Sequence, residues 1–378
     1  MKSALCDRLG IEFPLFAFTH CRDVVAAVTN AGGMGILGAV NHTPESLEIE
    51  LNWIDEHVNG KPYGVDLLIP NKLVGKDDEL TAADFEARVP PEHRNYVKDL
   101  LEKNGIDASD LWDNTADAKY GDNYRADSLT EVMDVAFAHP IKMMVNALGV
   151  PPEYMLSQAH ARDILVGALT GAKEHAIKHA EAGVDVLVTS GTEAGGHCGE
   201  VSTMVLIPEV VEAMEAYPNV SVLAAGGIAT GRQMAACMAM GAAGAWTGSV
   251  WLTTAEAETI PTVKAKMLAA GSRNTVRSRS RTGKPTRQLQ STWTDAWHAD
   301  GAPDPLPMPL QGLVTRPAMA KIDKLAEGGH QGAQDLATYF VGQAVGLMNV
   351  EQSARSVVYD FMEDYATAVE RLSATVAE

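Results

Sequence analysis

The sequence predicts an α/β fold, a (β/α)8 TIM barrel with a helical insertion after the third strand and a C-terminal extension. Short apolar runs alternate with helix-length amphipathic segments, as in parallel sheets with crossover helices. Eight such runs are present, nearly all followed by a helical segment, which suits a closed barrel better than an open sheet. Glycine-rich segments follow the last three runs, at the edge where such barrels carry their active sites. The strand candidates are residues 13–18, 35–40, 63–68, 141–146, 163–166, 184–189, 221–225 and 244–248.

The segments between these strands are expected to be helices at residues 23–31, 44–57, 151–159, 173–182, 207–217, 232–240 and 254–270. One connection is much longer than the others. Residues 70–140 are charged and contain helix-prone pieces at 82–88, 94–103 and 128–136. A loop in this position usually has only a handful of residues. We therefore expect an inserted lid or interaction subdomain. The alternative is a set of solvent-exposed helices with no role in catalysis.

The C-terminal part of the chain differs in composition. Residues 271–329 are rich in arginine and proline, with the arginines interspersed among serine and threonine. We expect a loop that packs on the barrel mouth, with a nucleic-acid contact as the weaker alternative. Two amphipathic segments, 335–348 and 353–372, are expected to close the fold as helices. The predicted division is a barrel of residues 1–69 and 141–270, an inserted subdomain at 70–140 and an extension at 271–378.

Composition narrows the class of function. The chain has 378 residues, of which 46% are hydrophobic and 21% charged, as is typical of a globular enzyme. The formal charge of −19 would repel nucleic acid and anionic lipid, so we expect a small-molecule substrate. The cysteines form no Cys-x-x-Cys pair, so no metal site or disulfide framework is expected. Without a leader-like or membrane-length apolar run, we expect a cytoplasmic protein, and the sequence leaves open whether it forms a homo-oligomer.

The segment after the sixth strand has the composition of a ligand site. Residues 190–199 contain four glycines and one imidazole, that of His197. Gly195 and Gly196 allow the backbone to approach a flat ligand closely. The imidazole, with an unperturbed pKa of about 6.5, suits proton transfer near neutral pH. A simple glycine turn with a solvated histidine is the alternative.

Two further segments place glycine at the same edge of the barrel. Gly226 and Gly227 follow the seventh strand, and Gly248 and Ser249 follow the eighth. Backbone amides in these loops commonly bind phosphate in barrels of this type. The lysine of a P-loop is absent, and the glycines at 32–35 precede a strand rather than open a helix. The pattern therefore predicts a cofactor with a phosphate tail and gives no support to a nucleotide-triphosphate or dinucleotide fold.

These segments carry a resemblance to the nitronate monooxygenase family, formerly called 2-nitropropane dioxygenases. The matching stretches are residues 10–14, 30–38, 191–197, 224–232 and 240–249. They cover most of the barrel in the family's order, and the insertion lies outside them. The resemblance implies an FMN-dependent (β/α)8 flavoprotein that oxidises alkyl nitronates or nitroalkanes with O2 to a carbonyl compound and nitrite.

Carried over residue by residue, the resemblance also implies a site. The residues expected to bind FMN are Phe18, Thr19, Asp66, Ser190, Gly195, Gly196, Gly226, Gly227, Gly248 and Ser249. Of these, Gly227, Gly248 and Ser249 would hold the phosphate. His197 would stand over the flavin ring as the catalytic base that removes a proton alpha to the nitro group.

The chain departs from the family pattern at three places. His20 follows the first strand where the family commonly has a Gln-Ala-Pro-Met-like turn, and it is expected either to act on the substrate as a second catalytic imidazole or to be a hydrogen-bonded mouth residue. Asp66 stands where many members have an asparagine, so a negative charge either faces the flavin or is turned away. Leu169 replaces a lysine of some members, which would make reduced, anionic flavin less favourable.

Two other functions are compatible with the sequence. Residues 199–208 also resemble the FMN-containing enoyl-acyl-carrier-protein reductases, which are related to this family. This favours, as the alternative, an NAD(P)H-dependent FMN reductase that acts on a quinone or an enoyl thioester. A non-enzymatic flavin-binding scaffold, whose insertion binds a partner, is the third candidate. Adding NADH or NADPH without oxygen separates them, because prompt bleaching of the flavin indicates a reductase.

Overall fold

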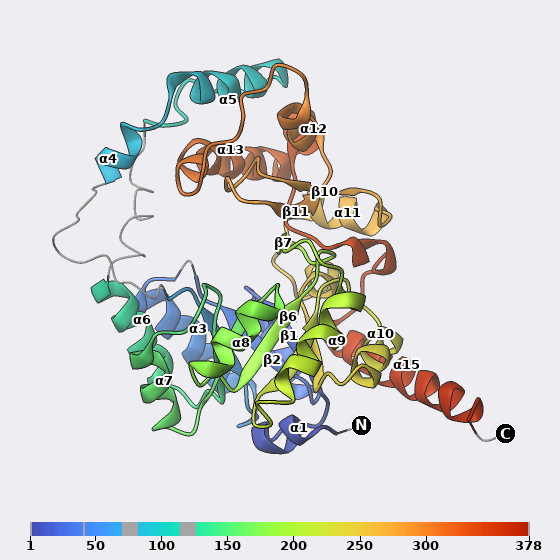
Figure 1. Ribbon diagram of the computed structural model, residues 1–378. Coiled ribbons are helices and arrows are strands. Elements are labelled where there is room, and N and C mark those ends of the chain that lie inside the picture. The colour runs from blue at the N-terminus through green and yellow to red at the C-terminus, as the bar shows by residue number, and fades with distance from the viewer. Residues whose placement is uncertain (1, 41, 70–81, 114–125, 377–378) are drawn as a thin grey trace.

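The computed structural model describes residues 2–40, 42–69, 82–113 and 126–376 (Figure 1). Eight parallel strands close into a barrel, with the last paired to the first. They are β1 (Leu15–Thr19), β2 (Met34–Gly38), β3 (Gly64–Leu67), β4 (Met143–Asn146), β5 (Leu165–Thr170), β6 (Val186–Ser190), β8 (Ser221–Ala225) and β9 (Gly244–Thr247). The predicted (β/α)8 barrel is confirmed, and each predicted run overlaps one strand. The strand expected at 163–166 begins later because Asp163, at φ 57°, belongs to the preceding turn.

Helices follow the strands around the outside of the barrel. They are α2 (Arg22–Asn30), α3 (Pro44–His57), α6 (Ala126–Ala138), α7 (Glu153–His160), α8 (Lys173–Glu181), α9 (Thr203–Met214) and α10 (Gly231–Ala239). The predicted helix at 44–57 begins at a capping box formed by Thr43 and Ser46. The C-terminal helix α15 (Ala354–Ala374), expected at 353–372, packs on α10 and α2. Its position completes the outer wall next to β9 and β1.

The described parts of residues 70–140 contribute to two different parts of the molecule. α6 packs on α3 and shares its apolar cluster, so it serves as the crossover helix between β3 and β4. α5 (Pro91–Lys103) packs instead on α13 (Leu310–Glu327) of the C-terminal part. The short α4 (Ala82–Glu86) precedes α5. The division of the chain at 70 and 140 stays a prediction, while these contacts place α6 with the barrel and α5 with the C-terminal helices.

A second apolar cluster lies beyond the mouth of the barrel, and we call its elements the cap (Figure 1). The cap consists of α5, α11 (Pro261–Ala269), α12 (Thr292–His298), α13, α14 (Gln331–Leu336) and the antiparallel hairpin of β10 (Thr275–Ser278) and β11 (Thr286–Leu289). Trp293 is fully buried in this cluster. The expectation of a loop over 271–329 is therefore wrong, because β10, β11, α12 and α13 lie within this range, and turns and the proline-rich connection before α13 join them.

The prediction of one continuous helix over 335–348 is also wrong, because the middle of this segment is not helical. α14 ends at Leu336, and the chain then runs extended, with Phe340 bridged to Gln288 of β11, before the 3-10 turn η4 (Gln343–Leu347). A contact with a strand edge thus replaces the hydrogen bonds of a continuous helix. This extended segment reaches the barrel mouth, where it contacts the loop after β6.

Alternate residues of the strands fill the barrel interior, as in other closed barrels. The inward side chains of its lower part are large and apolar and include Phe16, Ile36, Val145, Val188, Leu223 and Trp246. α1 (Ala4–Leu9) adds Leu5 and Leu9 to the same cluster. The barrel is therefore a packed core, and a ligand has room only above this layer. Within the part of the chain that the structure describes, no helix has both the length and the apolar character needed to cross a membrane.

Candidate active site at the barrel mouth

The uppermost inward positions of the barrel hold small or polar residues. Gly38 faces inward, since a Cβ there would come within 2.9 Å of the rings of Phe18 and His20. At Gly248 a Cβ would meet only Phe18, at 3.9 Å. Leu169 packs against the interior cluster, so the position expected for a lysine is apolar. The backbone at Gly248 is thus open to a ligand that lies across the mouth, whereas Gly38 is covered by the rings of Phe18 and His20.

Asp66 is the polar group of this layer. It lies two residues after Gly64, whose missing Cβ faces Ile36 and Met143 of the interior, so the Asp66 side chain points into the barrel. The residue is 2% exposed, and its Oδ1 has no hydrogen-bond partner. Burial raises the pKa of this carboxyl well above its ordinary value. Burial favours the protonated carboxyl, whose Oδ1 has no hydrogen-bond partner among the residues that the structure describes, as expected of a group that meets a polar ligand.

The loop that carries His197 is held by the cap. Its short strand β7 (Gly196–His197) pairs with β11, with His197 opposite Thr286 (Figure 1). Two arginines of the hairpin bind the loop on either side. Arg287 donates from Nε to the carbonyl of Thr192 at 2.9 Å. Arg277 donates from Nη2 to the carbonyl of Cys198 at 3.5 Å.

The imidazole of His197 has no hydrogen-bond partner within the described part of the protein, and its side chain has access to solvent at the mouth. The protein around the ring still removes part of its water, and this desolvation lowers the pKa of His197. The ammonium group of Lys284, at the turn of the hairpin, lowers the pKa further. The ring is therefore neutral at pH 7 and able to accept a proton.

His20 is held differently. Its Nδ1–H donates to the carbonyl of Gly38 at 2.7 Å, which leaves Nε2 as an acceptor. Its ring meets that of Phe18 edge-on, with centroids 5.2 Å apart. β1 and β6 are not neighbours in the barrel, since β8 and β9 lie between them. His20 and His197 therefore stand on different sides of the mouth, and Thr19, whose Oγ1 accepts from the Cys21 amide, belongs to the His20 side.

The loops expected to bind phosphate converge on one segment of the extension. Gly226 and Gly227 have positive φ angles of 95° and 73°, and a Cβ on Gly227 would come within 2.9 Å of Glu193. Gly342 donates its amide hydrogen to Ser249 Oγ at 2.8 Å. A Cβ on Gly342 would also lie 3.1 Å from the amide nitrogen of Gly195. The loops after β6, β8 and β9 thus meet at one end of the mouth.

The residues present fit a flavin. Left-handed glycines and close backbone approach at one end of the mouth suit a phosphate tail, and the unpartnered Asp66 carboxyl suits a polar ring. Sequence reasoning missed three parts of this arrangement, which are Lys284, the Gly342 segment and His42. His42 follows β2, and burial lowers its pKa, with the carboxylate of Glu50 opposing this shift and His20 adding to it. Its place after a strand of the barrel was the signal that could have identified it.

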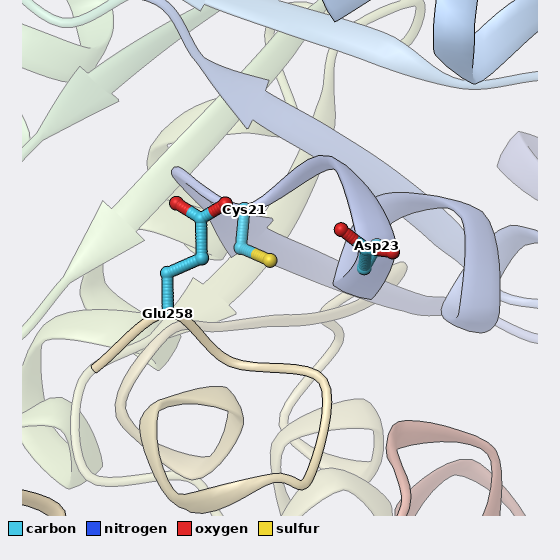
Figure 2. Close-up of side chains that lie close together, drawn as sticks. All are labelled: Cys21, Asp23 and Glu258. Carbon is cyan, nitrogen blue, oxygen red and sulfur yellow. The ribbon is translucent and has the colours of Figure 1, made fainter. Parts of the chain in front are cut away.

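A group of possible metal ligands lies behind the β1 loop. The sulfur of Cys21 and the carboxylates of Asp23 and Glu258 have ligand atoms within 4.8 Å of one another (Figure 2). However, the thiol donates a hydrogen bond to the carbonyl of Glu256 at 3.1 Å, and burial raises its pKa. A protonated thiol is a poor metal ligand, so Cys21 is explained by its hydrogen bond to Glu256 rather than by a metal ion.

Known proteins resemble this chain over most of its length. The model of the nitronate monooxygenase family matches residues 2–364. A protein of Mycobacterium tuberculosis whose name suggests a monooxygenase is 52% identical over 377 residues, with 100% of both chains covered. The (3aS,4S,5R,7aS)-5-hydroxy-7a-methyl-1-oxo-octahydro-1H-indene-4-carboxyl-CoA dehydrogenase of Rhodococcus jostii is 34% identical, covering 80% of this chain and 69% of its own. Among solved structures, the nitroalkane oxidase of Streptomyces ansochromogenes is similar, with a TM-score of 0.78, 25% identity, and 98% and 100% of the two chains covered.

Proposed function

The chain belongs to the nitronate monooxygenase family, whose members are flavin-dependent oxidoreductases, and from this premise we propose that it binds FMN and oxidises alkyl nitronates or nitroalkanes with O2. The observation that carries the proposal is His197, whose imidazole has a lowered pKa and no hydrogen-bond partner among the described residues, while its backbone is paired with β11 at the mouth of the barrel. Carbonyl compound and nitrite are the expected products.

Each part of the mouth has a role in this proposal. The amides of Gly227, Gly248 and Ser249 hold the phosphate, with Gly226 shaping the turn before them. Phe18, Thr19, Ser190, Gly195 and Gly196 line the ring of the cofactor, and Asp66 donates a hydrogen bond to it from its protonated carboxyl. The flavin supplies the electron transfer to oxygen when bound.

His197 acts as the base on a neutral nitroalkane. Its imidazole accepts the proton from the carbon next to the nitro group, and the substrate becomes the nitronate anion. The lowered pKa keeps the ring in the accepting form at neutral pH. A nitronate that is supplied as the anion needs no such step. His20, whose Nδ1–H is committed to Gly38, is a fixed acceptor on the other side of the mouth and contacts the substrate without taking its proton.

A second function is favoured by one observation. The 34% identical relative from Rhodococcus jostii is a dehydrogenase of a carboxyl-CoA compound. This relative supports a thioester of coenzyme A as a substrate class, and the competing proposal is an NAD(P)H-dependent flavin reductase that acts on an enoyl thioester or a quinone. Both functions use a flavin at the mouth, and they differ in what reduces it.

Spectra of the purified protein separate the two functions. Under anaerobic conditions, NADH, NADPH, nitroethane and ethyl nitronate are each added to the flavin-loaded protein, and the flavin absorbance is followed. We expect ethyl nitronate and nitroethane to bleach the flavin and the nucleotides to leave it oxidised. Bleaching by NADH or NADPH alone would favour the reductase. A protein that takes up no FMN would contradict both proposals.

A further inference from the structure

The turn of the β10–β11 hairpin brings a lysine to the base at the barrel mouth. Lys284 lies two residues before Thr286, the partner of His197 in the small sheet. Its side chain is exposed and has no carboxylate partner among the residues that the structure describes. The register of β7 and β11 places Lys284 diagonally to His197, and its positive charge lowers the pKa of the His197 ring. The proposed function does not use this cation.

The other cations of the hairpin are occupied within the protein. Arg279 pairs with Asp304 and also donates to the carbonyls of Gly283 and Pro305. Arg277 pairs with Glu200, and Arg287 is bound to the carbonyl of Thr192. Arg281 lies over the rings of Phe340 and Tyr339. In a chain of net charge −19, the ammonium group of Lys284 is thus a cation held available at the mouth.

The turn itself is held firmly by the cap. Gln311 of α13 donates from Nε2 to the carbonyl of Ser280 at 2.9 Å, and Thr315 donates to that of Arg281 at 2.7 Å. Both α13 side chains are buried. Thr282 Oγ1 is hydrogen-bonded to both the amide and the carbonyl of Lys284. The backbone of Lys284 therefore has a fixed place, and only its flexible side chain has to find a ligand.

We propose that Lys284 is an anion-binding and specificity-determining residue of the site, which holds the negatively charged oxygens of a nitronate or a similar small oxyanion next to His197. This rests on the proposed function for the identity of the substrate. An ammonium group attracts an anion and gains little from a neutral nitroalkane, so it favours the nitronate over its conjugate acid. The cation also stabilises the anion that forms when His197 takes the proton, because the negative charge then develops on the nitro oxygens.

The experiment is a titration of the flavin-loaded protein with sodium nitrate, a planar oxyanion of the size of a nitro group, followed by the change in flavin absorbance. The variants are Lys284→Met, Lys284→Arg and, as a matched control, Arg273→Met. Arg273 is an exposed cation before β10, at the end of the hairpin away from the turn. We expect the Kd for nitrate to rise about tenfold in Lys284→Met and to stay within about twofold in the other two. An unchanged Kd in Lys284→Met would overturn the proposal.

Kinetics give a second readout that a merely structural role would not produce. In Lys284→Met we expect the KM for ethyl nitronate to rise about tenfold with kcat within about twofold, and the KM for neutral nitroethane to change less than about threefold. An equal rise for both substrates would overturn the proposal. If the wild-type protein does not oxidise nitronate but nitrate binding still depends on Lys284, the proposed function fails and the anion site stands. If nitronate is oxidised but nitrate binding is independent of Lys284, the proposed function stands and the anion site at Lys284 fails.

Discussion

Two imidazoles stand at the same barrel mouth, and the protein holds them in opposite ways. His20 has a fixed ring, because Nδ1 is bonded to the Gly38 carbonyl and the ring lies against Phe18. His197 has a fixed backbone and a free ring, because β11 holds its main chain and no described residue bonds its nitrogens. A base must accept a proton and release it again, which a free ring does more readily than one whose Nδ1–H is committed.

The two sides also differ in what supports them. His20 depends on the barrel alone, through β1 and β2. His197 depends on the cap, since Arg287 and the β7–β11 pairing come from the C-terminal part of the chain. Changes in the hairpin are therefore expected to affect the proton transfer, whereas changes around His20 are expected to affect only how the substrate sits.

The largest expected effect separates the two imidazoles directly. For His197→Asn we expect kcat/KM for nitroethane to fall about a thousandfold, because a base of this kind contributes about 10²- to 10⁴-fold. For His20→Asn, which retains a hydrogen-bonding side chain, we expect a fall of less than about tenfold. Steady-state oxygen consumption on both purified variants, at equal flavin content, measures the difference. Similar losses of kcat/KM in the two variants would contradict the different roles assigned to His197 and His20.

The next effect tests the support of His197 by the cap. In Arg287→Met the carbonyl of Thr192 loses its guanidinium partner, and we expect kcat for nitroethane to fall about tenfold because a small displacement of a catalytic group is costly. Arg279→Met is the matched control, since Arg279 bonds to Asp304 and Pro305 rather than to the loop. Its kcat is expected to stay within about twofold. An equal fall in the control would mean that the hairpin matters only for folding.

Asp66 provides a smaller effect on cofactor binding. Because burial raises the pKa of the Asp66 carboxyl and so favours its neutral form, Asp66→Asn is expected to keep the affinity for FMN within about threefold. Asp66→Val removes the donor, and the Kd for FMN is expected to rise about tenfold. Fluorescence titration of the apoprotein with FMN measures both. Loss of binding in Asp66→Asn would show that the charged form is the one required.

The smallest effect is a shift of the pH profile. His197 works as the neutral ring, so kcat/KM for nitroethane should be full above its pKa and fall as the pH drops through it. Because desolvation and Lys284 lower this pKa, the fall should lie below about pH 6.5. Replacing Lys284 by methionine removes the positive charge that lowers the pKa of His197. The loss of kcat/KM should therefore move to higher pH by less than about one unit. A shift to lower pH would contradict the assignment of the titrating group.

The barrel could be predicted because its signals are local. Each strand is a short apolar run buried on both faces, and each wall helix has its own amphipathic pattern, as at 44–57. The loops with Gly195, Gly227 and Gly248 could be placed at one edge because parallel strands end together. The position of these loops could be predicted without knowing which other segments of the chain pack on them.

The cap and its contacts could not be predicted, because they depend on pairings between distant segments. Nothing local in Thr286 indicates that it pairs with His197, and nothing around Phe340 indicates a bridge to Gln288. The amphipathic pattern of 335–348 favours a helix, but the edge of β11 and the close approach of Gly342 to Gly195 favour an extended chain. Lys284 and His197 are also far apart in the sequence, so their proximity could not be predicted.

The most direct test of His197 as the base is the reduction of the bound flavin in the absence of oxygen. His197→Asn is mixed in a stopped-flow instrument with nitroethane and, separately, with ethyl nitronate, and flavin absorbance is recorded. We expect ethyl nitronate to reduce the flavin of the variant at a rate within about threefold of the wild-type protein, because the anion needs no base, and nitroethane to leave it oxidised. Loss of reduction by both substrates would contradict the role of His197, and so would an unchanged rate with nitroethane.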